Sequence, residues 1–154
     1  MTPLREINEF LGKKRLAVIG VSRNPKDFTR TLFRELLQRG YDAIPVNPAV
    51  EEAEGVTCYP RVEDISPAVE GALLLTSPAV TEKVVEECAH AGIDAVWLYR
   101  AGGAGAVSPR ALEFCQSQGM HTVNGECPFM FLPGAAWPHR LHGFCRKVVG
   151  RYPK

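Results

Sequence analysis

The sequence lacks the features that mark several specialised classes of protein. Its formal net charge is only +1, so no global field favours nucleic acid or a membrane surface. No apolar run approaches the roughly 20 residues that a membrane span needs. The opening MTPLREINEFLGKKR is amphipathic and contains acids, which does not fit a secretory signal. These absences predict a cytoplasmic, soluble protein that binds neither nucleic acid nor a membrane.

The cysteines lack the spacing of a disulfide or metal framework. They are Cys58, Cys88, Cys115, Cys127 and Cys145, with no C-x-x-C pair and one left over. This pattern predicts reduced thiols in a cytosol. His139, His142 and Cys145 share one stretch near the C-terminus, but with Cys127 they match no established zinc pattern. We therefore predict no metal site and expect these side chains to pack or to face solvent.

What is present is an ordinary globular composition with an alternating pattern of elements. Hydrophobic residues make up 45% of the 154 positions and charged residues 23%, which predicts one domain over residues 1–154. Within it we expect a leading helix in 1–15, an α/β core in 16–127 and a helical extension in 128–154. The predicted strands are 16–19, 41–46, 71–75, 93–98 and 120–123.

Helical periodicity recurs between these strands. One helix is expected at 4–11 and one around 32–37, another opens at Pro78 and stops at Gly92, and a fourth opens at Pro109 and stops at Gly119. Residues 49–70 are predicted to be irregular, with at most one short helix between Pro60 and Pro67. An amphipathic helix is expected at 137–149. The alternation predicts right-handed βαβ units, and hence a doubly wound parallel sheet covered on both faces in three α/β/α layers.

In such a sheet the ligand binds beyond the carboxyl ends of the strands, so the loops there are the candidate site. They span 20–26, 45–48, 76–78, 100–108 and 124–128 and are rich in glycine, hydroxyl and amide residues. Such loops let backbone N–H groups approach an anion, and the helix N-termini that follow add partial positive charge. Arg23, Lys26 and Arg30 supply fixed charge for phosphates. The site is expected to hold a phosphate-bearing nucleotide.

The first loop is a weak signal by itself. Gly20 is not followed by the other glycines of G-x-G-x-x-G, and no GK[ST] makes a Walker A loop. A plain tight turn at Gly20 therefore remains open. The second strand ends in Asn47 and Pro48 rather than in the acidic residue that a dinucleotide ribose requires, which disfavours NAD and FAD.

Four motifs carry a more specific signal. They are GVS-x-NP at 20–25, GY-x-x-IPVNP at 40–48, E-G-x-x-x-YP at 54–60, and AVWL at 95–98 before a glycine-rich loop. Together they cover about residues 16–127 and resemble the small stand-alone CoA-binding domain proteins. Those proteins are similar to the CoA-binding domain of the succinyl-CoA synthetase α subunit. The resemblance implies a Rossmann-like fold and a bound coenzyme A or acyl-CoA.

The resemblance also implies which residues meet the ligand. It places the CoA phosphates and adenosine against Gly20, Val21, Ser22, Lys26, Thr29 and Arg30, then Val46, Asn47 and Pro48, then Thr76, Ser77 and Pro78. The glycine-rich loop near Gly102 is expected to close over the ligand. Arg23, Asn24 and Arg100 complete the candidate cofactor-binding set. Relatives often carry a lysine directly after PVNP, where this chain has Ala49, and Arg100 is expected to replace part of that charge.

Catalytic signals are few, so an enzyme is the less favoured hypothesis. No Ser–His–Asp order is visible, and Cys127 beside Glu126 is the one candidate nucleophile. The synthetase histidine belongs to a domain outside the matched region, so the resemblance implies no ligase activity. The sequence thus favours a non-catalytic carrier, sensor or regulatory module for CoA. A CoA- or nucleotide-dependent enzyme using the same pocket remains an alternative, as does an interaction protein with a vestigial pocket.

The C-terminal segment has a basic bias. No acidic residue follows Glu126, whereas five basic residues do: Arg140, Arg146, Lys147, Arg151 and Lys154. A packed helix with a solvated basic face is the ordinary interpretation. The apolar stretch near Phe129 also suggests a homodimer or a protein partner on this segment.

Overall fold

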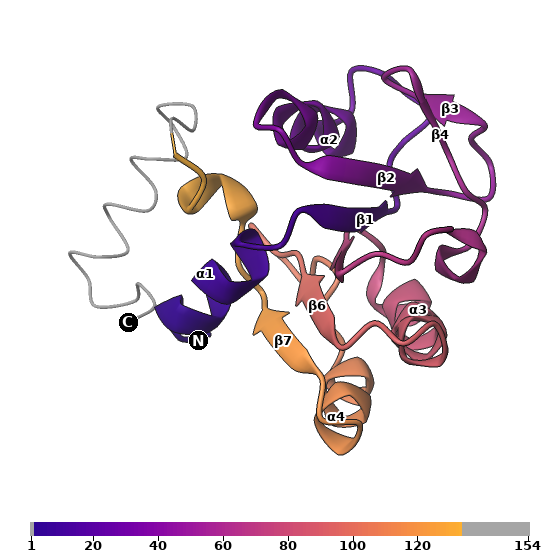
Figure 1. The fold of residues 1–154 in the computed structure, drawn as a ribbon. Coiled ribbons are helices and arrows are strands. Elements are labelled where there is room, and N and C mark those ends of the chain that lie inside the picture. Colours follow the sequence, from indigo (N-terminus) through magenta and orange to yellow (C-terminus); the bar gives the residue numbers. More distant parts are fainter. Residues whose placement is uncertain (1, 134–154) are drawn as a thin grey trace.

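The structure of the chain is a computed structural model that describes residues 2–133. Within this range a sheet of parallel strands runs through the molecule (Figure 1). Its members are β1 (Arg15–Ile19), β2 (Asp42–Val46), β5 (Gly71–Leu74), β6 (Ala95–Leu98) and β7 (His121–Asn124), in the order β2-β1-β5-β6-β7. The chain steps outward from β1 to β2 and then returns to β5 on the other side of β1. This reversal opens a crevice between the loops at the carboxyl ends of these strands.

Helices cover both faces of the sheet, as the sequence predicts. They are α1 (Leu4–Leu11), α2 (Phe28–Gln38), α3 (Pro78–His90) and α4 (Pro109–Ser117). Phe10 of α1 and Phe33 of α2 are buried in one apolar cluster, whereas Val85 of α3 and Cys115 of α4 are buried in the other. The two clusters lie on opposite sides of strands that are themselves buried on both faces. The predicted doubly wound, three-layer Rossmann-like fold is therefore confirmed.

The segment between β2 and β5 differs from the prediction. We expected irregular chain with at most one short helix, and a 3₁₀ helix, η1 (Val62–Asp64), does occur there. The prediction missed a small hairpin of β3 (Glu52–Ala53) and β4 (Val56–Thr57). Glu54 and Gly55 join its strands with φ of 51° and 77°, and two consecutive positive φ angles are typical of a two-residue hairpin turn. Strands of two residues are too short to show an alternating pattern.

Tyr59 extends the sheet beyond β2. The Tyr59 N–H donates to the Pro45 carbonyl over 3.0 Å, and the Asn47 N–H donates to the Tyr59 carbonyl over 2.9 Å. Because the N–H and C=O of a strand residue point to the same side, the nitrogen of Pro45 also faces this outer side. A proline is tolerated at that position, since the missing donor is not needed by β1.

The predicted C-terminal extension is described only at its start. A short 3₁₀ helix, η2 (Pro128–Met130), follows β7, and Phe129 packs into the cluster beneath α1 and α2. The helix expected at 137–149, with His139, His142 and Cys145, lies outside the described residues. Within residues 2–133, no helix is long and apolar enough to cross a membrane.

Candidate functional site

A pocket of about 550 Å³ lies at the carboxyl ends of β1, β2 and β5, on the face of the sheet that α3 covers. Its wall is formed by the strand ends, the start of α3 and the segment before η1. The lining residues are Ile19, Gly20, Val46, Asn47, Pro48, Pro60, Arg61, Val62, Thr76, Val80, Lys83, Val84 and Glu87. This volume is in the range of small-molecule and cofactor sites, and the position is the crevice that the strand order creates.

Gly20 allows the chain to turn sharply at the bottom of this pocket. Its φ is +96°, and its N–H donates to the Val46 carbonyl over 2.9 Å. A Cβ at this position would lie 3.0 Å from the Leu75 carbonyl oxygen. Both the backbone angle and this close approach require glycine, so the loops after β1 and β5 come together only because residue 20 has no side chain.

The α3 wall of the pocket combines an apolar surface with charge. Val80 is 49% exposed although it is a large hydrophobic residue, and Val84 lies one turn further along the helix. Lys83 and Glu87 line the same wall, and Arg61 contributes a second cation from the opposite side. Lys83 and Arg61 were missed because nothing in the local pattern separates a pocket cation from a solvated one.

The N-terminus of α3 is open toward this pocket. Ser77 is the N-cap residue but its side chain makes no capping hydrogen bond, and Pro78 follows at the first helical position. The Thr76 and Thr81 hydroxyls are 2.7 Å apart and bond to each other. Within residues 2–133, the first-turn N–H groups of α3 therefore have no side-chain acceptor, and they lie beside two residues, Thr76 and Val80, that line the pocket.

The loop after β1 presents the opposite arrangement, because its polar groups bond to one another. The Ser22 N–H donates to Thr29 Oγ1 over 2.8 Å, the Asn24 N–H to Ser22 Oγ over 3.1 Å, and the Lys26 N–H to Asn24 Oδ1 over 3.0 Å. Asp27 Oδ1 accepts from both the N–H and the hydroxyl of Thr29, at 2.8 and 2.7 Å. The Asp27 carboxylate thus caps the positive N-terminal end of α2.

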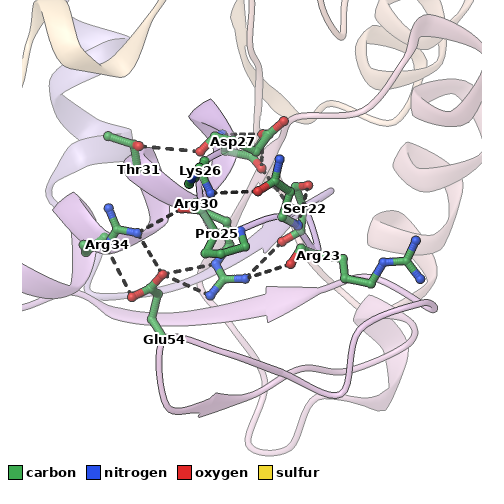
Figure 2. A network of polar contacts seen from close by, with 11 residues as sticks. Ser22, Arg23, Pro25, Lys26, Asp27, Arg30, Thr31, Arg34 and Glu54 are labelled. Atoms are coloured by element: carbon green, nitrogen blue, oxygen red, sulfur yellow. Dashed lines mark hydrogen bonds and ion pairs between the residues drawn. The ribbon is translucent and has the colours of Figure 1, made fainter.

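Arg30 and Arg34 of α2 converge on Glu54 at the tip of the β3–β4 hairpin (Figure 2). Arg30 Nη2 and Arg34 Nη2 each lie 3.0 Å from Glu54 Oε1, and Arg34 Nε donates to Glu54 Oε2 over 3.2 Å. Hydrogen bonds from Arg34, together with those from Arg30, hold the pKa of the Glu54 carboxyl below its usual value, and Glu54 raises the pKa of Arg34. Arg30 Nη1 also donates to the Ser22 carbonyl over 3.3 Å. This guanidinium is therefore engaged by protein groups.

The structure brings some of the predicted site residues together at the pocket and places others elsewhere. Those that line the pocket are Gly20, Val46, Asn47, Pro48 and Thr76. Ser77 and Pro78 begin α3 directly after Thr76. Asn47 Nδ2 donates to the carbonyl of Val21 over 2.9 Å, so Asn47 fixes the first loop while the Val21 side chain is fully buried. The remaining first-loop members, Ser22, Arg23, Asn24, Lys26, Thr29 and Arg30, belong to the internally bonded loop and its helix.

Arg100 and Gly102 lie in the loop after β6, apart from the pocket lining. The Arg100 guanidinium covers Gly125 at the end of β7: a Cβ on Gly125 would lie 2.9 Å from Arg100 Nη2. In Figure 2 the Arg23 side chain extends away from the network around Glu54, while its carbonyl faces Arg30. The strand order explains the separation of Arg100, because β6 and β7 lie beyond β5 and away from the reversal point.

Cysteine chemistry finds little support in the described part of the chain. Cys58, Cys88 and Cys115 are buried, and burial raises the pKa of each thiol, for Cys88 to about 12. Cys127, the candidate nucleophile, is 2% exposed and does not line the pocket. The raised pKa values of Cys58, Cys88 and Cys115 favour their protonated thiols, which are poor nucleophiles and poor metal ligands. Within residues 2–133, no three His, Cys, Asp or Glu side chains gather into a metal site.

The sheet order and the crevice at its reversal point define a doubly wound α/β ligand-binding fold. Within that class, residues 14–133 match the family model of the CoA-binding domain, and the chain belongs to that family. The resemblance seen in the sequence is thereby confirmed. A solved structure of a hypothetical protein from Pyrococcus horikoshii OT3 has 30% sequence identity and a TM-score of 0.75, covering 83% of this chain and 92% of that one.

Two curated relatives differ greatly in size. The α subunit of ADP-forming acetate–CoA ligase II from Pyrococcus furiosus is 30% identical over 97 residues, which cover 62% of this chain and 21% of the subunit. YneT from Bacillus subtilis is 26% identical over 123 residues, covering 79% of this chain and 88% of that protein. The chain therefore spans about a fifth of the ligase subunit that it matches.

Proposed function

We propose that the pocket at the ends of β1, β2 and β5 binds coenzyme A or an acyl-CoA, and that the chain acts as a non-catalytic carrier, sensor or regulatory module. The observation that carries this proposal is the position of the pocket. It lies at the reversal point of the sheet and beside the uncapped N-terminus of α3. Membership of the CoA-binding domain family supports the choice of ligand.

The chemistry of the wall suits the parts of CoA. The ligand carries a flat adenine base, a 3′-phosphate and a pyrophosphate. Val46, Val80 and Val84 offer an apolar surface for a base, while Lys83 and Arg61 offer cations for phosphates. The first-turn N–H groups of α3 are a further anion-binding element. Because Arg30 is engaged by Glu54, we assign phosphate recognition to the α3 side of the crevice rather than to α2.

The absence of catalytic groups from the pocket wall supports a binding role. Among the described residues that line it, the titratable side chains are Arg61, Lys83 and Glu87, which include no histidine or cysteine and no second carboxylate. Nucleophilic catalysis or a general acid–base pair requires more than this. The ligase named among the relatives is a protein about five times as long as the aligned region, so its reaction is not transferred to this chain.

Calorimetric titration with CoA, dephospho-CoA, NAD and ATP tests the proposal. We expect saturable binding of CoA, weaker binding of dephospho-CoA, and a rise in the unfolding temperature that follows CoA concentration. Val80→Trp would place a ring in the pocket, and we expect it to weaken CoA binding at least about tenfold. Ala79→Trp adds the same ring to an exposed neighbour outside the lining and serves as the matched control.

Two results would contradict the proposal. If CoA neither binds nor stabilises the wild-type chain, the ligand assignment is wrong. If Val80→Trp and Ala79→Trp both bind CoA as the wild type does, CoA binds somewhere other than this pocket.

A further inference from the structure

Residues 47–62, which we call the strap, wrap around the outer edge of β2 and supply two parts of the pocket wall. The strap begins with Asn47 and Pro48 at the pocket and ends there with Pro60, Arg61 and Val62. Between these ends it forms the β3–β4 hairpin, whose Ala53 is buried in the cluster of α1 and α2 on the opposite face of the sheet. The position of both pocket segments therefore depends on how the strap is held.

Buried side chains, hydrogen bonds and ion pairs hold the strap in place, and Ala53 and Val62 anchor it in the two apolar clusters. The Asn47–Tyr59 and Tyr59–Pro45 hydrogen bonds fasten it to β2, and the Cys58 N–H donates to the Glu51 carbonyl over 2.8 Å within it. The hairpin tip is held by Glu54, which forms an ion pair with both Arg30 and Arg34 of α2 (Figure 2). Arg30 is only 11% exposed at its side chain, so this pairing is shielded from solvent more than an ordinary surface ion pair.

Glu54 adopts an unfavourable backbone conformation to make these contacts. Its φ of 51° lies in the left-handed region, where it is the sole non-glycine residue among those described. Glycine, asparagine or aspartate would fit that region better. A glutamate is therefore a poor choice for the turn itself, but its length and charge allow it to reach the two guanidinium groups.

The network also reaches the loop after β1. Arg30 contacts Glu54 through Nε and Nη2 and donates from Nη1 to the carbonyl of Ser22, with a longer contact of 3.5 Å to the carbonyl of Arg23. One guanidinium thus joins the strap to the loop that follows Gly20. Both of these segments approach the pocket, from which Glu54, Arg30 and Arg34 are themselves absent.

We propose that Glu54 is a positioning residue: through Arg30 and Arg34 it holds the strap and the first loop in the arrangement that the ligand requires. This inference rests on the proposed function, because CoA is the ligand whose affinity reports it. Segments that are ordered before binding lose less conformational entropy when the ligand arrives. Loss of the carboxylate is therefore expected to lower affinity without changing any group that touches CoA.

Three substitutions at one position separate positioning from stability. Glu54→Gln removes the charge and keeps the strained turn. Glu54→Gly removes the charge but relieves the strain, so we expect it to be more stable than Glu54→Gln. Glu54→Asp keeps the charge on a shorter side chain. Glu52→Gln is the matched control, since Glu52 is exposed in the same hairpin and forms no ion pair with any described residue.

The primary measurement is the Kd for CoA, taken well below the unfolding temperature of every variant. We expect Kd to rise about tenfold in both Glu54→Gln and Glu54→Gly, to recover at least partly in Glu54→Asp, and to stay unchanged in Glu52→Gln. If Glu54→Gly binds CoA like the wild type, affinity follows stability rather than the carboxylate, and the proposal is overturned.

A second measurement needs no ligand. Hydrogen exchange of the Asn47 and Tyr59 amides reports whether the strap is held on β2. We expect faster exchange in Glu54→Gln and Glu54→Gly but not in Glu52→Gln. Unchanged exchange would show that Glu54 does not hold the strap and would overturn the inference. If the wild type fails to bind CoA while exchange responds as expected, the failure lies in the proposed ligand, and the role of Glu54 in holding the strap is retained.

Discussion

The helices α2 and α3 begin at the same edge of the sheet, but their first turns differ in side-chain capping. At α2, the carboxylate of Asp27 accepts the hydrogen bond from Thr29 and satisfies the positive end of the helix. At α3, Ser77 makes no such bond and the first turn opens beside the pocket. The loop with more polar and basic residues is thus the one that is already satisfied. Of these two helix starts, the one without a side-chain cap among the described residues is therefore the one beside the pocket, although the other loop holds more polar residues.

The charges of the two regions follow the same division. Arg30 and Arg34 are both paired with Glu54 on the α2 side. On the α3 side, Lys83 faces the pocket, and Arg61 pairs with Glu63 through a side chain that remains 55% exposed. A phosphate can therefore approach the α3 side without displacing a shielded carboxylate, whereas it would have to displace Glu54 on the other side.

The largest expected effect is on the free energy of unfolding, and it comes from adding a side chain at Gly20, where the loop after β1 meets the end of β5. Gly20→Ala adds a Cβ at positive φ and only 3.0 Å from the Leu75 carbonyl, and we expect it to lower the free energy of unfolding by about 2 kcal/mol. Gly92→Ala is the control, because Gly92 has a φ of +77° but nothing within 4 Å of the added carbon, and about 1 kcal/mol is expected. Urea denaturation measures both values. Equal losses would show that the contact with Leu75 contributes nothing.

A smaller effect distinguishes the two groups of charges. Lys83→Ala removes a cation from the pocket wall, and we expect the Kd for CoA to rise about fivefold. Lys26→Ala removes one from the exposed first loop, and we expect less than about a twofold change. Titration calorimetry at low and at physiological salt measures both. The reverse ranking would move the phosphates to the α2 side and contradict the comparison.

The smallest effect concerns how the stability that the Glu54 ion pairs contribute on the α2 side changes with pH. Because Arg34 and Arg30 lower the pKa of Glu54 in the folded state below its ordinary value of 4.5, the ion pairs stabilise the fold at pH values above 4.5. This contribution is lost as the pH falls through the lowered pKa. We therefore expect the difference in unfolding free energy between the wild type and Glu54→Gln to shrink below pH 4.5. A difference that is constant from pH 7 to pH 3, measured by urea denaturation, would contradict the assignment.

Much of the fold was predictable because its signals are local. Runs such as 16–19 and 71–74 are apolar throughout, which is typical of strands buried on both faces, and Pro78 and Pro109 mark helix starts. The β3–β4 hairpin was not predictable in this way. Its turn has glutamate at a positive φ, and the reason for that glutamate is an ion pair with residues 20 and 24 positions earlier in the chain.

The candidate site was predictable as a set of loops but not as a pocket. The sheet topology places Gly20, Asn47 and Thr76 together, and the structure shows all three in the wall. Val80, Lys83, Val84 and Glu87 are the residues of α3 that face the crevice, and no local sequence pattern separates them from residues that face solvent or the core. The engagement of Arg30 depends on a contact that is distant in sequence.

The pairing of Tyr59 with the outside of β2 has a consequence for how the molecule meets copies of itself. An exposed sheet edge is a template on which other chains can add strands and aggregate. On the outer side of β2, Tyr59 forms hydrogen bonds with the Pro45 carbonyl and the Asn47 N–H, and Pro45 has no backbone N–H to donate. A foreign strand can therefore pair with Pro45 and Asn47 on this margin only by displacing Tyr59, and β7 forms the opposite margin of the sheet.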